Sequence, residues 1–483
     1  MHVFRPLGPS LLIALLALPW ALPAPARATA TLAADTVIDG QLEMAWADRA
    51  PFLVAGPSSR FAVRLITHDG RTLPLEPQAA LRAAGNLYAL FGQHVGVAFD
   101  PTAQTAAVGS PLTSEAIVPF TAPAANQATG VNGSQPWVTL MCKFAGNSSE
   151  PKSKAYFSAM YGTAAGELGD YWQQVSYGKI NIAGSTAYGW ASLPHPRSYY
   201  ITGSGSSQSA NLDQLFADCT AAFDAVVDFS QFVGVALVFN GDLDGYAWGG
   251  NRYASLDGQY KSWRVTWQPP WSYQNLAPSA HEMGHGFGLP HANNSDQDSD
   301  PYDNPWDVMS DSWSNAIHSA TYGSLPKHIS IWSRDALGWI DASDKQVLAD
   351  NGIWRGIHLS FAELGNPAGY REIRIQPPGA PASRYFTLEA RQKAGDYDGN
   401  LAATAVIVHA VDTNRQEPAW SVDRRMPPAD TANNRESLFL VGDRYDLAPD
   451  VHLSVTAQVS DGFLLDVQIG DIPEVIFRGG FEL

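Results

Sequence analysis

The sequence predicts a mixed α/β (α+β) domain followed by a β-rich domain of the sandwich type. In the middle of the chain, helix-length and strand-length apolar segments alternate. Beyond about residue 345, only short apolar or alternating runs remain, separated by turn residues. A chain of 483 residues is also long enough for more than one domain. We therefore expect domains at 131–345 and 346–472, with a smaller part before them.

The first residues are typical of an export signal. Arg5 supplies a positive charge, residues 11–22 are apolar, and small residues suited to cleavage lie around Ala28. This pattern predicts a signal peptide at 1–28 and a secreted, extracellular protein. The apolar run is too short and too broken by proline to favour a membrane span.

Residues 29–130 form the next segment and end in a polar, proline-punctuated linker. Within the segment, residues 79–90 could form one helix, with Gly85 as its weak point. The segment could be a propeptide that is removed, or an N-terminal domain that stays in the mature protein.

Five segments define the expected α/β domain. Strands are predicted at 137–144 and 232–239, which are rich in valine and aromatic residues. Helices are predicted at 156–175, at 212–227 and at about 278–286.

The β-rich domain is predicted from short runs at 371–375, 405–409 and 451–455. A tail at 473–483 follows. Its sequence is similar to a short tail on some exported bacterial proteins, so it could be a sorting signal or a disordered end.

Charge and cysteine content narrow the function classes. The net charge is −17 with no cluster of lysine or arginine, which argues against binding to nucleic acids or anionic membranes. Cys142 and Cys219 suit an oxidising compartment and could form a disulfide, although a buried free thiol remains an alternative. Neither lies in the N-terminal segment, which disfavours a cysteine-switch propeptide.

Residues 281–291 carry the most specific pattern, H-E-x-x-H-x-x-G-x-x-H. His281 and His285 are four residues apart, so on a helix they share one face and can reach one metal ion. Gly288 can adopt positive φ and turn the chain, which brings His291 back as a third ligand. Three protein ligands leave one position open, as in a catalytic zinc site. Glu282 is then placed to act as general base.

A less specific interpretation also exists. Ser279 and Glu282 have the spacing of a helix capping box, in which Glu282 would only stabilise the start of the helix.

Met309 lies eighteen residues after the third histidine of this pattern. In this position it resembles the methionine turn of the metzincin superfamily, which supports the three histidines from below. Some metzincins carry a zinc-binding tyrosine two residues after that methionine, but Asp311 stands there in this chain. Tyr322 is near in sequence, without an argument that it reaches the metal.

Four further phrases, at 170–179, 306–309, 337–340 and 385–391, resemble the immune inhibitor A-like family of secreted bacterial metalloproteases. The likeness covers about residues 135–415. It implies a metzincin-like catalytic domain, one catalytic Zn²⁺ and protein or peptide substrates. The expected activity is a zinc-dependent endopeptidase (a metalloendopeptidase), in which a metal-activated water attacks the peptide bond and Glu282 is the base.

Two other groups of residues invite interpretation. The first is an acidic loop after His291 with the carboxylates of Asp296, Asp298, Asp300 and Asp303. This loop could bind Ca²⁺ or be a solvated loop, and Pro301 excludes an EF-hand. Three tryptophans before the zinc motif could line a cleft or fill the core, namely Trp263, Trp267 and Trp271.

Three alternative functions remain at this point. The first is a narrow-specificity protease directed at glycoproteins. The second is a surface-polymer binding protein with an accessory metalloprotease domain. The third is a structural zinc protein, which the sequence disfavours because no fourth protein ligand is evident. A monomer is the simplest expectation for all of them.

Overall fold

The computed structural model describes residues 37–53, 56–99, 110–120 and 130–470. Strands account for 38% of the residues and helices for 19%, so the predicted mixed α/β character is confirmed. The predicted signal peptide, most of the linker and the tail lie outside the described residues.

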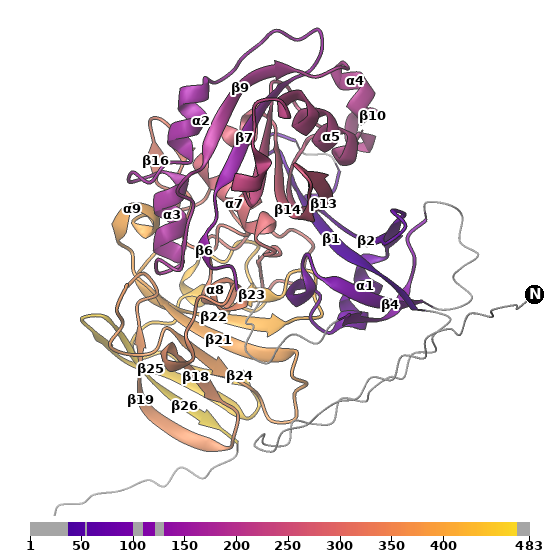
Figure 1. The fold of residues 1–483 in the computed structure, drawn as a ribbon. Coiled ribbons are helices and arrows are strands. Elements are labelled where there is room, and N and C mark those ends of the chain that lie inside the picture. The colour runs from indigo at the N-terminus through magenta and orange to yellow at the C-terminus, as the bar shows by residue number, and fades with distance from the viewer. Residues whose placement is uncertain (1–36, 54–55, 100–109, 121–129, 471–483) are drawn as a thin grey trace, which may run out of the picture.

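The largest sheet has ten strands and contains segments from both sides of residue 130 (Figure 1). Its strands are β1 (Val37–Arg49), β2 (Ser59–Thr67), β3 (Thr72–Leu75), β4 (His94–Phe99), β5 (Ser114–Pro119), β7 (Trp137–Lys143), β9 (Thr186–Ser192), β12 (Gly234–Phe239), β13 (Tyr246–Leu256) and β14 (Gln259–Gln268). Their order is β3-β2-β1-β13-β14-β12-β7-β9, and β4 pairs with β1 and β5. The antiparallel pairing of β1 with β13 connects the N-terminal strands to the rest of the sheet.

The helices are mostly short. They are α1 (Pro77–Ala84), α2 (Lys154–Met160), α3 (Leu168–Val175), α4 (Arg197–Tyr200), α5 (Leu212–Phe223), α6 (Pro270–Tyr273), α7 (Leu276–Gly286), α8 (Ile331–Ala336) and α9 (Gly395–Asp398). Short 3₁₀ turns are η2 (Tyr88–Leu90), η4 (Gly205–Ser207), η5 (Phe229–Gln231), η6 (Ala342–Asp344) and η7 (Arg435–Ser437). Two-residue strands are β6 (Gly133–Ser134), β8 (Ile180–Asn181), β10 (Ile201–Thr202), β11 (Ser209–Ala210), β15 (Asn293–Asn294), β16 (His318–Ser319) and β17 (Gly323–Ser324).

Three predicted helices are shorter than expected. The prediction of a single helix at 79–90 is wrong, because α1 stops at Gly85. This glycine has φ 69° and donates its backbone N–H to the carbonyl of Leu81. Glycine takes this left-handed conformation without a Cβ clash and so ends the helix. The segment 156–175 breaks into α2 and α3, with Gly166 at φ 80° between them. The predicted helix at 212–227 ends at Phe223.

The C-terminal part is β-rich, as predicted, and consists of two sheets. The first contains β18 (Lys345–Leu348), β20 (Glu372–Ile375), β21 (Arg384–Arg391), β22 (Ala405–Asp412), β23 (Ala419–Ser421) and β15, and the second β19 (Gly352–Ser360), β24 (Arg444–Ala448), β25 (Val451–Val459) and β26 (Gly462–Ile469). Apolar side chains of both sheets form one buried cluster, including Val408 from the first and Leu465 from the second. The two sheets therefore share one apolar core.

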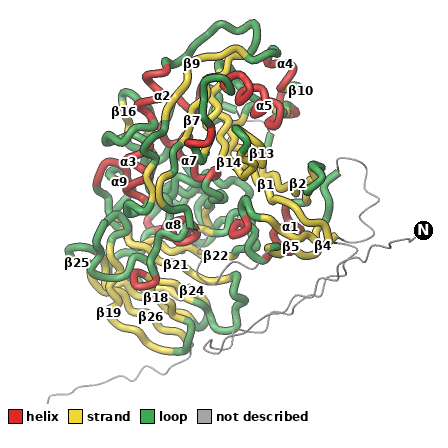
Figure 2. The backbone as a smooth tube through the Cα atoms, viewed as in Figure 1, coloured by secondary structure: helices red, strands yellow, loops and turns green. Residues whose placement is uncertain are grey.

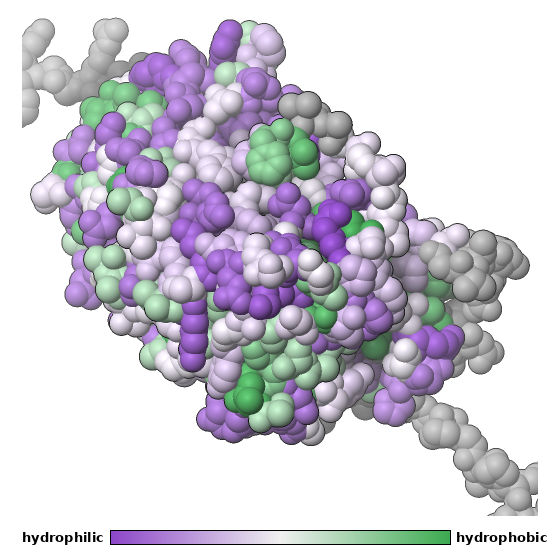
Figure 3. Space-filling model, turned by 90° about the horizontal axis from the view of Figure 1, so that it is seen from above, coloured by the Kyte–Doolittle hydropathy of each residue, from purple (hydrophilic) through white to green (hydrophobic). Residues whose placement is uncertain are grey.

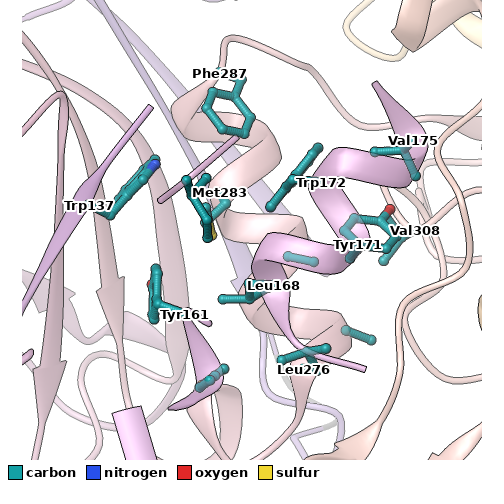
Figure 4. Packing of buried hydrophobic residues seen from close by; sticks show 14 of the residues in the cluster. Trp137, Tyr161, Leu168, Tyr171, Trp172, Val175, Leu276, Met283, Phe287 and Val308 are labelled. Carbon is teal, nitrogen blue, oxygen red and sulfur yellow. The ribbon is translucent and has the colours of Figure 1, made fainter. Parts of the chain in front are cut away.

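Helix α7 lies at the centre of the largest apolar cluster. Met283 and Phe287, four residues apart, share the face of this helix that packs on the core (Figure 4). The ring of Phe287 meets that of Trp172 edge-on at 4.8 Å and also approaches Trp137. Because His281 and His285 lie on another face, core packing fixes the direction in which they point.

The segment after α7 is mostly loop, as the central green tube in Figure 2 indicates. Asn293 and Asn294 pair in parallel with Trp420 and Ser421 of β23. This pairing attaches the segment just after His291 to the C-terminal part of the chain.

Cys142 on β7 and Cys219 on α5 form a disulfide, with their Cα atoms 6.0 Å apart. The bond fastens α5 to the sheet and removes the free-thiol alternative. Among the described residues, no helix is long and apolar enough to span a membrane. The face seen from above intermixes hydrophilic and apolar residues (Figure 3).

Candidate metal centre and active site

Helix α7 positions the first two histidines. The helix begins after Asn275, so Ser279 lies inside it rather than at its cap. The Ser279 hydroxyl donates to Gln268 Oε1 at 2.9 Å. The capping-box interpretation is therefore wrong. Pro278 is tolerated because it lies in the first turn, where its missing N–H has no helical partner.

Gly288 turns the chain after the helix, as its spacing predicted. Its φ of 98° is accessible to glycine, and a Cβ there would lie 2.9 Å from the ring of Phe91. The turn returns His291 to the helix face. The ring centroid of His285 then lies 4.6 Å from both His281 and His291. All three predicted ligands are buried and lie together.

Backbone carbonyls orient two of the imidazoles. The Nδ1 of His281 lies 2.6 Å from the carbonyl oxygen of Val308, and the Nδ1 of His285 lies 2.7 Å from that of Leu289. A proton on each Nδ1 leaves Nε2 with its lone pair directed into the cluster. Burial lowers the pKa of His285 to about 3, which keeps this ring neutral.

The donor atoms suit a tetrahedral metal ion. The Nε2 atoms of His285 and His291 are 3.2 Å apart, and His281 contributes a third nitrogen to the same cluster. Two nitrogens each about 2.0–2.1 Å from a tetrahedral zinc lie about 3.3 Å from one another. Three converging imidazoles are a typical zinc ligand set.

A fourth group that could bind a metal ion comes from the N-terminal segment, which the sequence did not indicate. Asp48, at the end of β1, lies with Oδ1 2.9 Å from His281 Nε2 and 2.7 Å from His291 Nε2. Its Oδ2 is 3.4 Å from His285 Nε2. Burial would raise the pKa of Asp48, but His281 and His291 outweigh it and hold that pKa well below its usual value. The Asp48 carboxylate therefore lies against all three histidines and belongs to the same buried cluster.

Two aromatic residues fix this arrangement. The indole of Trp46 stacks on the His285 ring at 4.9 Å with 9° between the planes. The Tyr302 hydroxyl donates to Asp48 Oδ1 at 2.7 Å, and its ring lies edge-on to His291 at 5.6 Å. Both contacts are absent from the sequence-based prediction, since neither residue has a recognisable spacing from the motif.

Glu282 is buried beside the three histidines, and both its carboxylate oxygens lack a hydrogen-bond partner within the described ranges. Burial, together with the nearby charge of Asp48, raises the pKa of Glu282 well above its usual value. Gly249 of β13 allows the strand to approach closely, because a Cβ there would lie 3.0 Å from Glu282 Oε2 and 2.7 Å from His285 Cβ. A buried, unpartnered carboxylate of this kind is typical of a reactive group.

A cavity opens beside Glu282 and His281, and its walls include Leu53, Trp271 and Trp313. Of the three tryptophans that precede the motif, only Trp271 lines this cavity. Trp263 and Trp267 are fully buried in the core.

Met309 packs against α7, the helix that carries His281 and His285. Its sulfur packs against Gly284, and its carbonyl accepts a hydrogen bond from the N–H of Ala292 at 2.9 Å. Asp311 accepts hydrogen bonds from the backbone N–H groups of the loop that follows it. Tyr322 packs on Tyr156, with 5.5 Å between the ring centroids.

Two further groups of candidate metal ligands occur in the described part of the chain. His328, Glu363 and Asp398 form one of them, but Arg391 already donates to Asp398 at 2.7 Å and to Glu363 at 3.1 Å. This group is therefore a buried ion-pair network.

The other group lies in the acidic loop. Of the predicted carboxylates, the structure brings Asp296 and Asp298 together with Asp430, while Asp300 and Asp303 lie close by. Asp430 is distant in sequence and was not predicted.

Comparison with known proteins gives no match: no family model matches this chain, and no curated protein matches it.

Proposed function

We propose that this chain is a secreted zinc-dependent endopeptidase of the metzincin type, in a latent form. The observation that carries the proposal is the buried cluster of three imidazoles beside an unpartnered glutamate, with Asp48 at the fourth ligand position. Secretion rests on the N-terminal sequence pattern, and the immune inhibitor A-like resemblance rests on motifs alone.

His281, His285 and His291 would hold the metal, and the carbonyls of Val308 and Leu289 would keep their rings in place. Zinc, when bound, supplies a Lewis acid and lowers the pKa of a water in its open position.

Glu282 would perform the proton transfer. Its carboxylate would accept a proton from the attacking water and pass it to the nitrogen of the leaving amine. The close approach of Gly249 holds this carboxylate beside the ligands instead of in solvent.

Strand β13 would hold the substrate in an extended conformation. At present β1 occupies this edge, with register pairs from Ala45–Gly250 to Arg49–Tyr246. Removal of β1 would free the backbone N–H and C=O groups of β13 for a peptide strand, a common mode of peptide recognition. Latency would thus have two components, the carboxylate at the metal and the strand on the substrate edge.

A structural metal site is the second candidate, and Asp48 favours it. Three histidines and one aspartate would complete a closed tetrahedral shell, which is typical of structural zinc. In that case the unpartnered Glu282 has no function, and removing the N-terminal segment would expose no activity.

Replacing Glu282 by Gln tests the proposed function. The variant should bind one zinc ion per chain and lose casein hydrolysis by about 10²- to 10⁴-fold, the usual contribution of a general base. Casein hydrolysis should be measured after the N-terminal segment has been removed, with zinc content as the control. Undiminished hydrolysis by Glu282→Gln would refute the assignment of this residue.

A further inference from the structure

The turn at residues 306–309 connects the metal centre to the C-terminal part of the chain. The Val308 carbonyl of this turn lies 2.6 Å from His281 Nδ1 and accepts its hydrogen bond. The direction of the His281 ring therefore depends on where this carbonyl lies. All four residues of the turn are fully buried, so contacts within the protein, and not solvent, hold the carbonyl in place.

Asp307 fixes the turn from within. Its Oδ1 accepts a hydrogen bond from the N–H of Met309 at 2.8 Å, and its Oδ2 accepts one from the N–H of Ser330 at 3.0 Å. The first contact closes the turn around Val308, and the second attaches the turn to the residue that caps α8. Hydrogen bonds to a carboxylate are stronger than those between neutral groups, so this side chain restrains the peptide groups on both sides of Val308.

Arg391, on β21, holds the same turn from the C-terminal part of the chain. Its Nη1 donates to the carbonyl oxygen of Trp306 at 2.6 Å. Its Nη2 donates to Asp398 at 2.7 Å, and its Nε donates to Glu363 at 3.1 Å. The guanidinium group is planar and presents its donors in a fixed geometry. Because the two carboxylates fix its plane, the fully buried Arg391 directs Nη1 at Trp306.

Strand β21 reaches the turn by a second route. Glu389 is two residues from Arg391, so both side chains project from the same face of the strand, and both are fully buried. Glu389 Oε2 accepts a hydrogen bond from the N–H of Ile331 at 3.1 Å. The neighbouring residue, Ser330, is the one that donates to Asp307. One strand of the C-terminal sheets therefore holds both the beginning of the turn and the segment against which the turn rests.

We propose that Arg391 and Asp307 are positioning residues of the metal centre, which act on His281 through the Val308 carbonyl. The inference rests on the proposed function, because it takes His281 to be a metal ligand. Groups that orient a ligating histidine from outside the coordination shell typically contribute about 10- to 100-fold to metal affinity. The C-terminal sheets would thus be part of the framework of the metal centre and not a separable binding module.

The test is the zinc affinity of the full-length Arg391→Lys protein, measured by competition with a chromophoric chelator. Lysine keeps the positive charge beside Asp398 and Glu363, but its single ammonium group cannot reproduce the three-way contact of the guanidinium. The affinity for zinc should fall about tenfold. The visible absorption spectrum of the protein loaded with Co²⁺ instead of zinc should also change, since it reports the ligand geometry. Parental zinc affinity together with a parental Co²⁺ spectrum would overturn the role of Arg391.

Arg371→Lys is the matched control. Arg371 is also buried, and its guanidinium donates to Asp344 at 2.9 Å and to the carbonyl of Gly365 at 2.6 Å. Within the described residues, none of its hydrogen bonds or ion pairs reaches the turn at 306–309. This variant should lower the Tm of the zinc-free protein as Arg391→Lys does, and leave the zinc affinity and the Co²⁺ spectrum unchanged. An equal loss of zinc affinity in both variants would mean general destabilisation and would contradict the proposal.

Asp307→Asn tests the turn independently and decides the question if Arg391→Lys does not fold. The amide keeps the size of the side chain but replaces one acceptor oxygen by a donor, so the N–H of Met309 or that of Ser330 loses its partner. Zinc affinity should fall about 10- to 100-fold, with a changed Co²⁺ spectrum. A parent protein that binds zinc as tightly as both variants do would refute this inference alone. A parent that binds zinc but hydrolyses no casein after removal of the N-terminal segment would refute only the proposed protease, and a parent that binds no zinc would refute both.

Discussion

Replacing Asp48 by Ala should increase the basal hydrolysis of casein by the unprocessed chain. Asp48 accepts a hydrogen bond from the Tyr302 hydroxyl at 2.7 Å and contacts His281 and His291 at 2.9 and 2.7 Å. Hydrogen bonds to charged groups contribute about 1.5–3 kcal/mol each. A difference of 1.4 kcal/mol changes an equilibrium constant tenfold. The loss of one such contribution should therefore raise the fraction of chains with an accessible metal site about 10- to 100-fold.

The variant should nevertheless remain slower than the processed enzyme. The backbone pairing of β1 with β13 does not depend on the Asp48 side chain and would still cover the substrate edge. The assay is the initial rate on fluorescent casein, with intact mass confirming that the chain is unprocessed.

Two controls accompany this measurement. The first is Asp39→Ala. Asp39 lies on the same strand and pairs with His94 at the surface, so its replacement should leave the rate unchanged. The double variant Asp48→Ala/Glu282→Gln should be inactive. A rate for Asp48→Ala equal to that of the parent, with zinc retained, would refute the argument that this carboxylate maintains latency.

Three other substitutions have defined outcomes. Replacing Cys142 and Cys219 together by Ala should lower the free energy of unfolding by about 4 kcal/mol, since the disulfide spans 77 residues, and urea denaturation measures it. Gly288→Ala should lower the affinity for zinc, because alanine disfavours φ 98° and its Cβ would clash at the turn; zinc content after dialysis measures it. The control is Gly379→Ala, which imposes similar backbone strain at φ 72° in open space and should leave the zinc content unchanged. Burial raises the pKa of Glu372 to about 8 from its usual 4.5. Between these pH values the folded state binds more protons than the unfolded state, so this residue should lower the free energy of unfolding as the pH rises from about 4.5 to 8. Glu372→Gln should flatten that part of the stability profile, and a parent and variant with parallel profiles would contradict the reasoning.

The local part of the site could be predicted from sequence. The four-residue spacing of His281 and His285 specifies one helix face, and the positive φ of Gly288 follows from the need to return His291. Met309 could be predicted only through the metzincin resemblance. These features depend on neighbours within about thirty residues, where spacing and backbone geometry determine position.

The non-local part could not be predicted. Asp48 is 243 residues from His291, and only the pairing of β1 with β13 brings them together. The sequence of β1 carries no signal for its partner strand, so its aspartate could not be distinguished from an ordinary surface residue. The same reason hides Asp430, while Asp296 and Asp298 were recognisable because they lie in one loop.

The helix boundaries illustrate the same limit at short range. The sequence pattern is compatible with a helix at 79–90, but Gly85 adopts a left-handed conformation and ends it. Glycine permits either outcome, and the surrounding packing decides between them.

The most direct test of the account combines intact mass, zinc content and casein hydrolysis of the secreted protein before and after limited proteolysis. We predict one zinc ion per chain in both forms, and strong hydrolysis only in the form whose mass shows the loss of a fragment that includes Asp48. A processed form that retains zinc without hydrolysing casein would favour the structural metal site. A fully active chain that still contains Asp48 would contradict the proposed latency.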